Sequence, residues 1–114
     1  MSIKSDIAEL EQGMKDLQEL VERKNLAESL STNRAFKKLI LEEYFVQEAA
    51  RLVQMSGDIR LSELDRSHAL AMAQATGHLK RYLSAIVQMG TSAENSLVEA
   101  NETLNELRAA DQDD

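Results

Sequence analysis

Residues 79–107, with the sequence LKRYLSAIVQMGTSAENSLVEANETLNEL, decide the fold of this chain. Apolar or small residues recur in this stretch at spacings that alternate strictly between four and three. Such a heptad pattern places them along one side of a helix, where they can pack against another helix. The seam residues are Leu79, Leu83, Ile86, Gly90, Ala93, Leu97, Ala100, Leu104 and Leu107.

A second heptad seam lies at the start of the chain and follows the same alternation of spacings. Its residues are Ile3, Ile7, Leu10, Met14, Leu17 and Val21. The pattern weakens after Val21, and Leu26 and Leu30 are predicted to resume the apolar face. Two heptad segments in one short chain predict an antiparallel coiled-coil arm.

The residues Ser31, Thr32 and Asn33 prefer N-cap or turn positions, so they predict a kink or break between two helices. An unbroken helix is the alternative, because neither Gly nor Pro stands there. The next helix has a stripe wider than a coiled-coil seam, which is typical of a helix with several neighbours. This stripe comprises Phe36, Leu39, Ile40, Phe45, Ala49, Leu52 and Val53, with Tyr44 nearby.

A turn is predicted at residues 56–61, where Gly57 is placed for a left-handed helix C-cap. The sequence from Ser62 to Asp65 fits a loose capping box at the start of a further helix. A fold-back near residue 59 would set the second helix against residues 62–85 and the first against residues 85–110.

The predicted fold is therefore all-α: a long antiparallel helical hairpin, or coiled coil, of two to three helices with a kink or break near residues 30–33. We expect one helical domain over residues 1–114, and the thin core that such a hairpin can bury predicts an oligomer. The predicted segments are helix 3–30, helix 33–55, turn 56–61, long helix 62–110 and a frayed tail 111–114.

Composition narrows the classes of function. The 114 residues include no Pro and no Cys, so uninterrupted helices are favoured and thiolate chemistry is excluded. The N-terminus lacks the apolar run of a signal peptide, and no stretch is apolar enough to cross a bilayer. We therefore expect a cytoplasmic protein without a membrane partner.

Charge is spread unevenly along the chain. The net charge is −7, with −3 on residues 1–33, +2 on residues 34–81 and −6 on residues 82–114. In the hairpin, Lys37 and Lys38 would stand at the height of Lys80 and Arg81. These four cations could form a patch that binds phosphate or an acidic partner, although six carboxylates in the same region favour internal ion pairs.

No catalytic or metal-binding pattern is evident. Asp65 and His68 have the carboxylate–histidine spacing of di-iron bundles, but such sites need the motif on two helices. The other histidine, His78, has Gln74 and Ala75 at the corresponding positions. We therefore predict a non-enzymatic protein without catalytic residues, metal or cofactor. Met55, Met72 and Met89 could line an adaptable binding groove, although such residues more often fill a core.

Part of the sequence resembles small helical proteins of tailed bacteriophages. The resemblance lies in residues 33–45, NRAFKKLILEEYF, in residues 48–53, EAARLV, and in residues 78–90, HLKRYLSAIVQMG, followed by an acidic tail. It extends over most of residues 33–107 and consists of ordinary helix-forming residues. It implies a phage protein made in the bacterial host cytoplasm, with a role in virion assembly, and it implies no activity and no site residues.

The leading hypothesis is a phage assembly protein (scaffold, chaperone or minor virion protein) or accessory protein that forms homo-oligomers and binds another protein. Its contacts within the arm and between subunits are assigned to eight seam residues: Ile7, Leu10, Met14, Leu17, Leu83, Ile86, Leu97 and Leu104. One alternative is a small terminase-like subunit that binds DNA through the basic middle of the chain. Another is an acidic inhibitor of a host DNA-binding protein.

Overall fold

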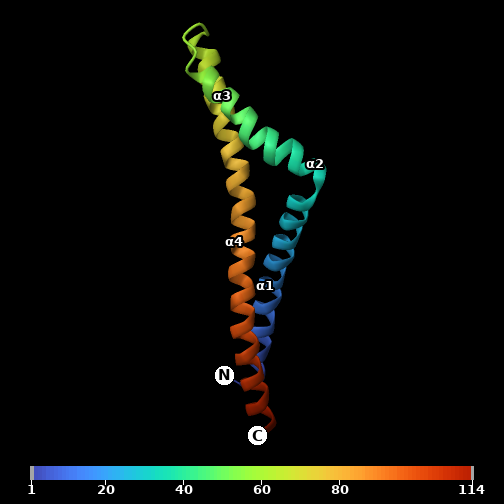
Figure 1. Cartoon of the computed structure of the whole chain (residues 1–114). Helices are drawn as coiled ribbons and strands as arrows, with labels where there is room; N and C mark the ends of the chain where they lie inside the picture. Colours follow the sequence, from blue (N-terminus) through green and yellow to red (C-terminus); the bar gives the residue numbers. More distant parts are fainter. Residues whose placement is uncertain (1, 114) are drawn as a thin grey trace. The chain divides into compact units, whose positions relative to one another are not determined.

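Helices make up every element of the structure. The computed structural model describes residues 2–113, and no strand occurs within this range. The elements are α1 (Ile3–Thr32), α2 (Arg34–Phe36), the π-helix η1 (Lys37–Glu48), α3 (Ala49–Ser56) and α4 (Glu63–Asp113) (Figure 1). The chain reverses direction between α3 and α4, so the predicted all-α hairpin fold is confirmed.

The predicted break between the first two helices is confirmed and is confined to Asn33. This residue leaves the helical conformation, with φ −74° and ψ 125°. Its side-chain Oδ1 accepts a hydrogen bond from the backbone N–H of Phe36 at 3.0 Å. The cap satisfies one of the backbone donors that a helix start leaves unpaired, and the chain therefore re-enters a helix immediately after Asn33.

The π-helix η1 differs from the α-helix that the sequence predicts, and apolar spacing gives a reason. Phe36 and Phe45 are nine residues apart, which in an α-helix is about two and a half turns. They would then point to opposite sides. A π-helix bonds each residue to the fifth along and has more residues per turn. Positions four or five apart in such a helix lie near one side, and Phe36, Ile40, Phe45 and Ala49, which have this spacing, are all half-buried.

The wider turn of η1 also changes which apolar residues face outward. Leu39 and Val53, which the α-helical stripe included, are both exposed, so this part of the prediction is wrong. The ammonium of Lys38 lies 3.6 Å from the carboxylate of Glu43, five residues along the chain. This spacing suits the repeat of a π-helix, in which fifth neighbours lie on adjacent turns.

Asp58 organises the turn before α4. Its carboxylate accepts hydrogen bonds from the backbone N–H of Arg60 at 3.0 Å and from the Arg60 guanidinium at 2.9 Å. Gly57 keeps a right-handed conformation with φ −99°, so the predicted left-handed cap is wrong. The Ser62 hydroxyl oxygen accepts a hydrogen bond from the N–H of Asp65 at 3.1 Å, which is the Ser half of the predicted capping box.

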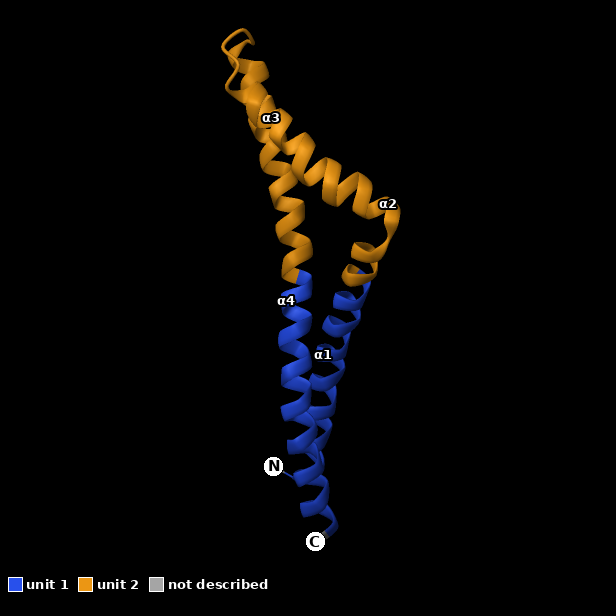
Figure 2. Cartoon of the chain, in the orientation of Figure 1, with its two compact units in different colours: residues 1–26, 86–114 blue, residues 27–85 orange. Residues whose placement is uncertain are grey.

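The chain divides into two units, where the sequence predicts a single helical domain (Figure 2). Unit 1 comprises residues 1–26 and 86–114, and unit 2 comprises residues 27–85. Unit 1 pairs most of α1 with the second half of α4. Unit 2 contains the end of α1, the segment from α2 to α3, the turn and the first half of α4. α4 is helical as far as Asp113, beyond the predicted end at residue 110, and residue 114 lies outside the described residues.

Candidate interaction surface

The two predicted heptad seams face each other in unit 1. Their positions are buried or half-buried within unit 1, whereas most positions between them are exposed. Two ion pairs join α1 to α4: Lys24 Nζ with Glu94 Oε1 at 2.8 Å, and Arg108 Nη2 with Glu11 Oε1 at 3.2 Å. The earlier residue of α1 pairs with the later residue of α4, so the two helices run antiparallel.

The eight residues predicted to carry contacts within the arm and between subunits all belong to these seams. Leu104 is buried, and the other seven are half-buried. Seven of them lie in unit 1, and Leu83 lies in unit 2. Because the α1–α4 pairing shields the seven residues of unit 1 within the chain, a partner that binds there without opening the pair needs another surface. The predicted residues are Ile7, Leu10, Met14, Leu17, Leu83, Ile86, Leu97 and Leu104.

Gly90 brings the two backbones of unit 1 close together. A Cβ atom placed on Gly90 would lie 2.2 Å from Cβ of Lys24 and 2.9 Å from its Cγ. The methylene stem of Lys24 therefore occupies the space that a side chain at residue 90 would fill. The Lys24 side chain keeps only 14% of its exposure while its ammonium reaches Glu94, the arrangement in which a long cation covers apolar surface with its stem.

Three apolar residues at the ends of the predicted seams are exposed. Leu26 and Leu30 do not continue the apolar face of α1. Half-buried Lys24 and buried Ala27 do so instead. Leu79, the first residue of the predicted α4 seam, is also exposed. These three seam assignments are therefore wrong. Where two helices are close, a small residue or the methylene stem of a lysine can fill a seam position as well as leucine does.

The core of unit 2 contains small residues. Ala69 and Thr76, seven residues apart on α4, are buried, as is Leu52 of α3. The hydroxyl of Thr76 donates to the backbone carbonyl of Ala73 at 2.8 Å, so its burial leaves no unsatisfied donor. Narrow side chains on α4 permit close packing, but they leave little apolar surface to bury inside unit 2.

A second apolar stripe runs along α4 in unit 2 and stays open. Met72, Ala75, Leu79 and Tyr82 follow one another at spacings of three, four and three, so they share one side of the helix. The larger three are 48%, 36% and 53% exposed, respectively. Ala75 is also exposed. Met72 is predicted from the sequence as a possible groove residue, and the spacing from Met72 to Tyr82 is the sequence signal for the rest of the stripe.

The first half of α4 is also poor in charge. Between Ser67 and Ala85, 19 residues include only two charged ones, Lys80 and Arg81. Residues 94–113 of the same helix include seven charged residues in 20. A helix that faces water usually carries charges on its outer side. The low charge of residues 67–85 therefore sets this part of α4 apart from a typical water-facing helix.

The four cations predicted to form one patch lie on separated elements. Lys37 and Lys38 begin η1, next to α2, and Figure 2 shows this region standing apart from α4, which carries Lys80 and Arg81. All four side chains are exposed. The ammonium of Lys38 is paired with Glu43. The arrangement therefore does not gather the four positive charges on one surface of unit 2.

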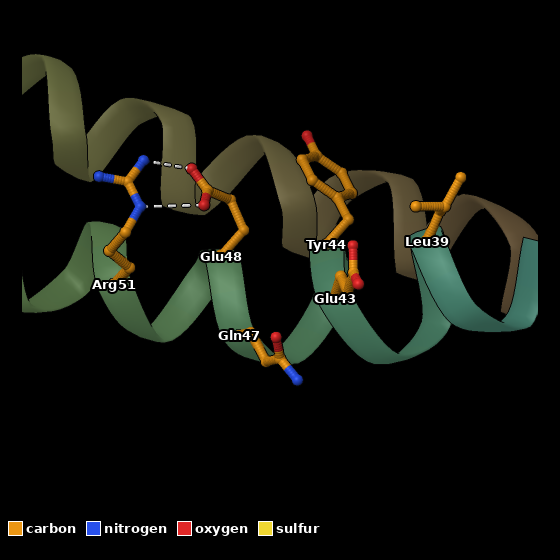
Figure 3. A pocket seen from close by; sticks show the side chains of 6 residues that line it. All are labelled: Leu39, Glu43, Tyr44, Gln47, Glu48 and Arg51. Atoms are coloured by element: carbon orange, nitrogen blue, oxygen red, sulfur yellow. Dashed lines mark hydrogen bonds and ion pairs between the residues drawn. The ribbon is translucent and has the colours of Figure 1, made fainter.

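A shallow pocket of about 400 Å³ lies on the surface of η1 and α3. Figure 3 shows Tyr44, Leu39 and the Glu48–Arg51 ion pair on one side of the helix, with Gln47 pointing away. The Arg51 Nε lies 2.9 Å from Glu48 Oε2. This side-chain hydrogen bond lowers the pKa of Glu48 and raises that of Arg51. The lining residues are Leu39, Glu43, Tyr44, Gln47, Glu48 and Arg51.

The two carboxylates that line this pocket, Glu43 and Glu48, are both engaged in ion pairs. A lowered pKa keeps Glu48 ionised at neutral pH, which is unsuited to a general acid. Among residues 2–113, no three potential metal-ligating side chains cluster together. Within the same range, no helix has the length and apolar character that crossing a membrane requires.

Comparison with known proteins finds no relative of this chain. No protein-family model, no curated protein and no solved structure matches the chain. The most prominent surface features of the chain are the open stripe of α4 and the other exposed apolar residues of unit 2.

Proposed function

We propose that this protein is a non-enzymatic helical module that works by self-association and by binding another protein. The observation that carries the proposal is the concentration of exposed large apolar residues in unit 2. Ten of the thirteen such residues among the described part of the chain lie there. These ten are Leu30, Leu39, Val46, Val53, Ile59, Leu64, Leu70, Met72, Leu79 and Tyr82.

Exposed apolar area favours association, because its burial removes it from water. Full burial of one leucine or methionine side chain contributes about 1.5–3 kcal/mol relative to exposure. Contiguous apolar surface is uncommon on monomeric proteins and marks interaction sites. A role as a bacteriophage assembly protein (scaffold, chaperone or minor virion protein) or accessory protein accords with such a module. That part of the proposal rests on the resemblance of residues 33–107 to small helical phage proteins.

DNA binding by a terminase-like subunit has less support. The separation of Lys37 and Lys38 from Lys80 and Arg81 removes the combined patch on which that hypothesis depended. Binding to phosphates gains affinity from several cations acting together. Two separate pairs, one of them partly neutralised by Glu43, therefore provide a weaker contact than one cluster of four.

The proposal is tested by measuring molar mass and melting temperature over a range of protein concentrations. Self-association that covers apolar surface stabilises the folded chain by mass action, so both quantities are expected to rise with concentration. Light scattering after size-exclusion chromatography gives the mass, and circular dichroism at 222 nm gives the melting temperature. A 12.8 kDa species with a constant melting temperature, and with no protein crosslinked to it in host cells, would contradict the proposed function.

A further inference from the structure

We propose that the open stripe of α4, formed by Met72, Ala75, Leu79 and Tyr82, binds the same stripe of a second copy in antiparallel orientation. This inference rests on the proposed function and names its surface and its partner. The spacing of three, four and three along a regular helix is that of a coiled-coil seam. A helix is therefore the element that fits this stripe best.

An interface with a second copy needs only a small part of the chain's surface. A standard protein interface covers about 800 Å² on each partner. This is about a tenth of the 8344 Å² that the chain exposes, so the chain has enough surface for a dimer interface of standard size.

Charge favours a second copy over a charged partner. The stripe itself carries no ionisable group except the phenol of Tyr82. Lys80 and Arg81 follow Leu79 by one and two residues, so they lie about 100° and 200° around the helix from it. Two identical stripes can therefore meet without placing like charges directly opposite each other. A strongly charged partner would find no complementary charges on this side of α4.

The antiparallel orientation follows from side-chain size. An antiparallel pair centred at residue 77 places Ala75 opposite Leu79 and Met72 opposite Tyr82. A small residue then faces a large one, the pattern that fills a helix interface evenly. The methionine sulfur also meets an aromatic ring, which is a favourable contact. A parallel pair would instead place Ala75 against Ala75 and Tyr82 against Tyr82.

The test compares Leu79→Glu with the matched control Leu70→Glu by sedimentation equilibrium. Leu70 is also exposed in unit 2, and nine residues of α-helix put it on the opposite side of α4. Leu79→Glu is expected to weaken dimerisation about 100-fold, because a symmetric dimer loses the apolar contact twice. Leu70→Glu is expected to leave the dimerisation constant within about threefold of wild type.

Orientation is tested by disulfide crosslinking, because the natural chain contains no cysteine. A mixture of Met72→Cys and Tyr82→Cys chains is expected to form a mixed disulfide. Each variant alone is expected not to crosslink, because ten residues of helix separate the two thiols by about 15 Å along the axis. Crosslinking also tests the proposed dimer if the Leu79→Glu variant fails to fold.

Several outcomes would overturn the inference. A wild-type dimer that persists in folded Leu79→Glu, or that is lost equally in Leu70→Glu, would refute this surface while leaving self-association standing. Disulfides between two copies of the same single-cysteine variant would refute the antiparallel orientation. A wild-type monomer at every concentration would refute the dimer, and the proposed function would then depend on crosslinking to a different protein.

Discussion

Both units are helical, but they cover their apolar residues to different extents. In unit 1, two heptad seams cover each other, Gly90 admits the stem of Lys24, and three large apolar residues stay exposed. In unit 2, the core contains Ala69, Thr76 and Leu52, and ten large apolar residues stay exposed. Unit 1 covers most of its own apolar residues, whereas unit 2 leaves apolar surface open, and this open surface is the one that we propose for partners.

The largest expected effect comes from the core of unit 1. Leu104 is only 5% exposed, and Leu104→Ala is expected to lower the free energy of unfolding by about 2–4 kcal/mol through lost burial and a cavity. The control is Val98→Ala on the exposed side of the same helix, for which a change within about 0.5 kcal/mol is expected. Urea denaturation followed by circular dichroism measures both. Equal effects at the two positions would contradict the closed packing assigned to unit 1.

The two glycines within α4 offer a sharper comparison. Gly90→Ala would force Cβ into contact with Cβ of Lys24, an atom that no rotamer change can move. We expect the helices to separate, at a cost of about 1–3 kcal/mol. At Gly77, no atom lies within 4 Å of an added Cβ, so Gly77→Ala is expected to stabilise the chain by up to about 1 kcal/mol. The melting temperatures should therefore shift in opposite directions, and a shift of the same sign would refute the close approach at Gly90.

The smallest expected effect concerns the turn of unit 2. Hydrogen bonds from the Arg60 side chain and backbone lower the pKa of Asp58, and the charge of Arg66 adds to this. A group whose pKa is lowered on folding adds stability above its unfolded pKa, about 3.9, and loses it as pH falls through the native value. The stabilisation by Asp58 is therefore present at neutral pH and disappears in acid.

The variant Asp58→Asn checks this dependence, because asparagine can still accept the backbone hydrogen bond of Arg60 without the charge. Wild type is expected to melt slightly above Asp58→Asn at pH 6. The two melting temperatures should converge as the pH falls below about 4. A difference that stays constant from pH 6 to pH 2 would show that ionisation of Asp58 does not stabilise the turn.

Much of unit 1 was predictable from the sequence, because the heptad spacing of each helix fixes which residues lie along its seam. The alternation of spacings from Leu83 to Leu107 and from Ile3 to Val21 places each seam on one side of its helix. A fold-back near residue 59 then sets the two seams against each other. The use of Lys24 as a seam residue was not predictable, since a lysine is interpreted as solvent-facing until Gly90 is seen across from it.

Unit 2 was less predictable, because its helix types depend on packing. The residues from Phe36 to Ala49 include no Gly or Pro, and their composition does not distinguish an α-helix from a π-helix. Their apolar spacing of four and five suits a π-helix. An α-helical stripe instead counts Leu39 and Val53 among its inner residues, although both are exposed. Equal heights along a hairpin likewise do not require the helices to touch, so Lys37 and Lys38 need not lie near Lys80 and Arg81.

By itself, the sequence determined an all-helical hairpin with a break before residue 34 and a turn near residue 58. Those features follow from helix propensity, capping residues and the heptad period, all of which act over a few neighbouring residues. Only the tertiary structure decided which apolar residues are covered, because burial depends on the distance between helices. A Gly90 that admits Lys24 closes one unit, whereas the π-helix and the small residues of α4 leave the stripe from Met72 to Tyr82 open in the other.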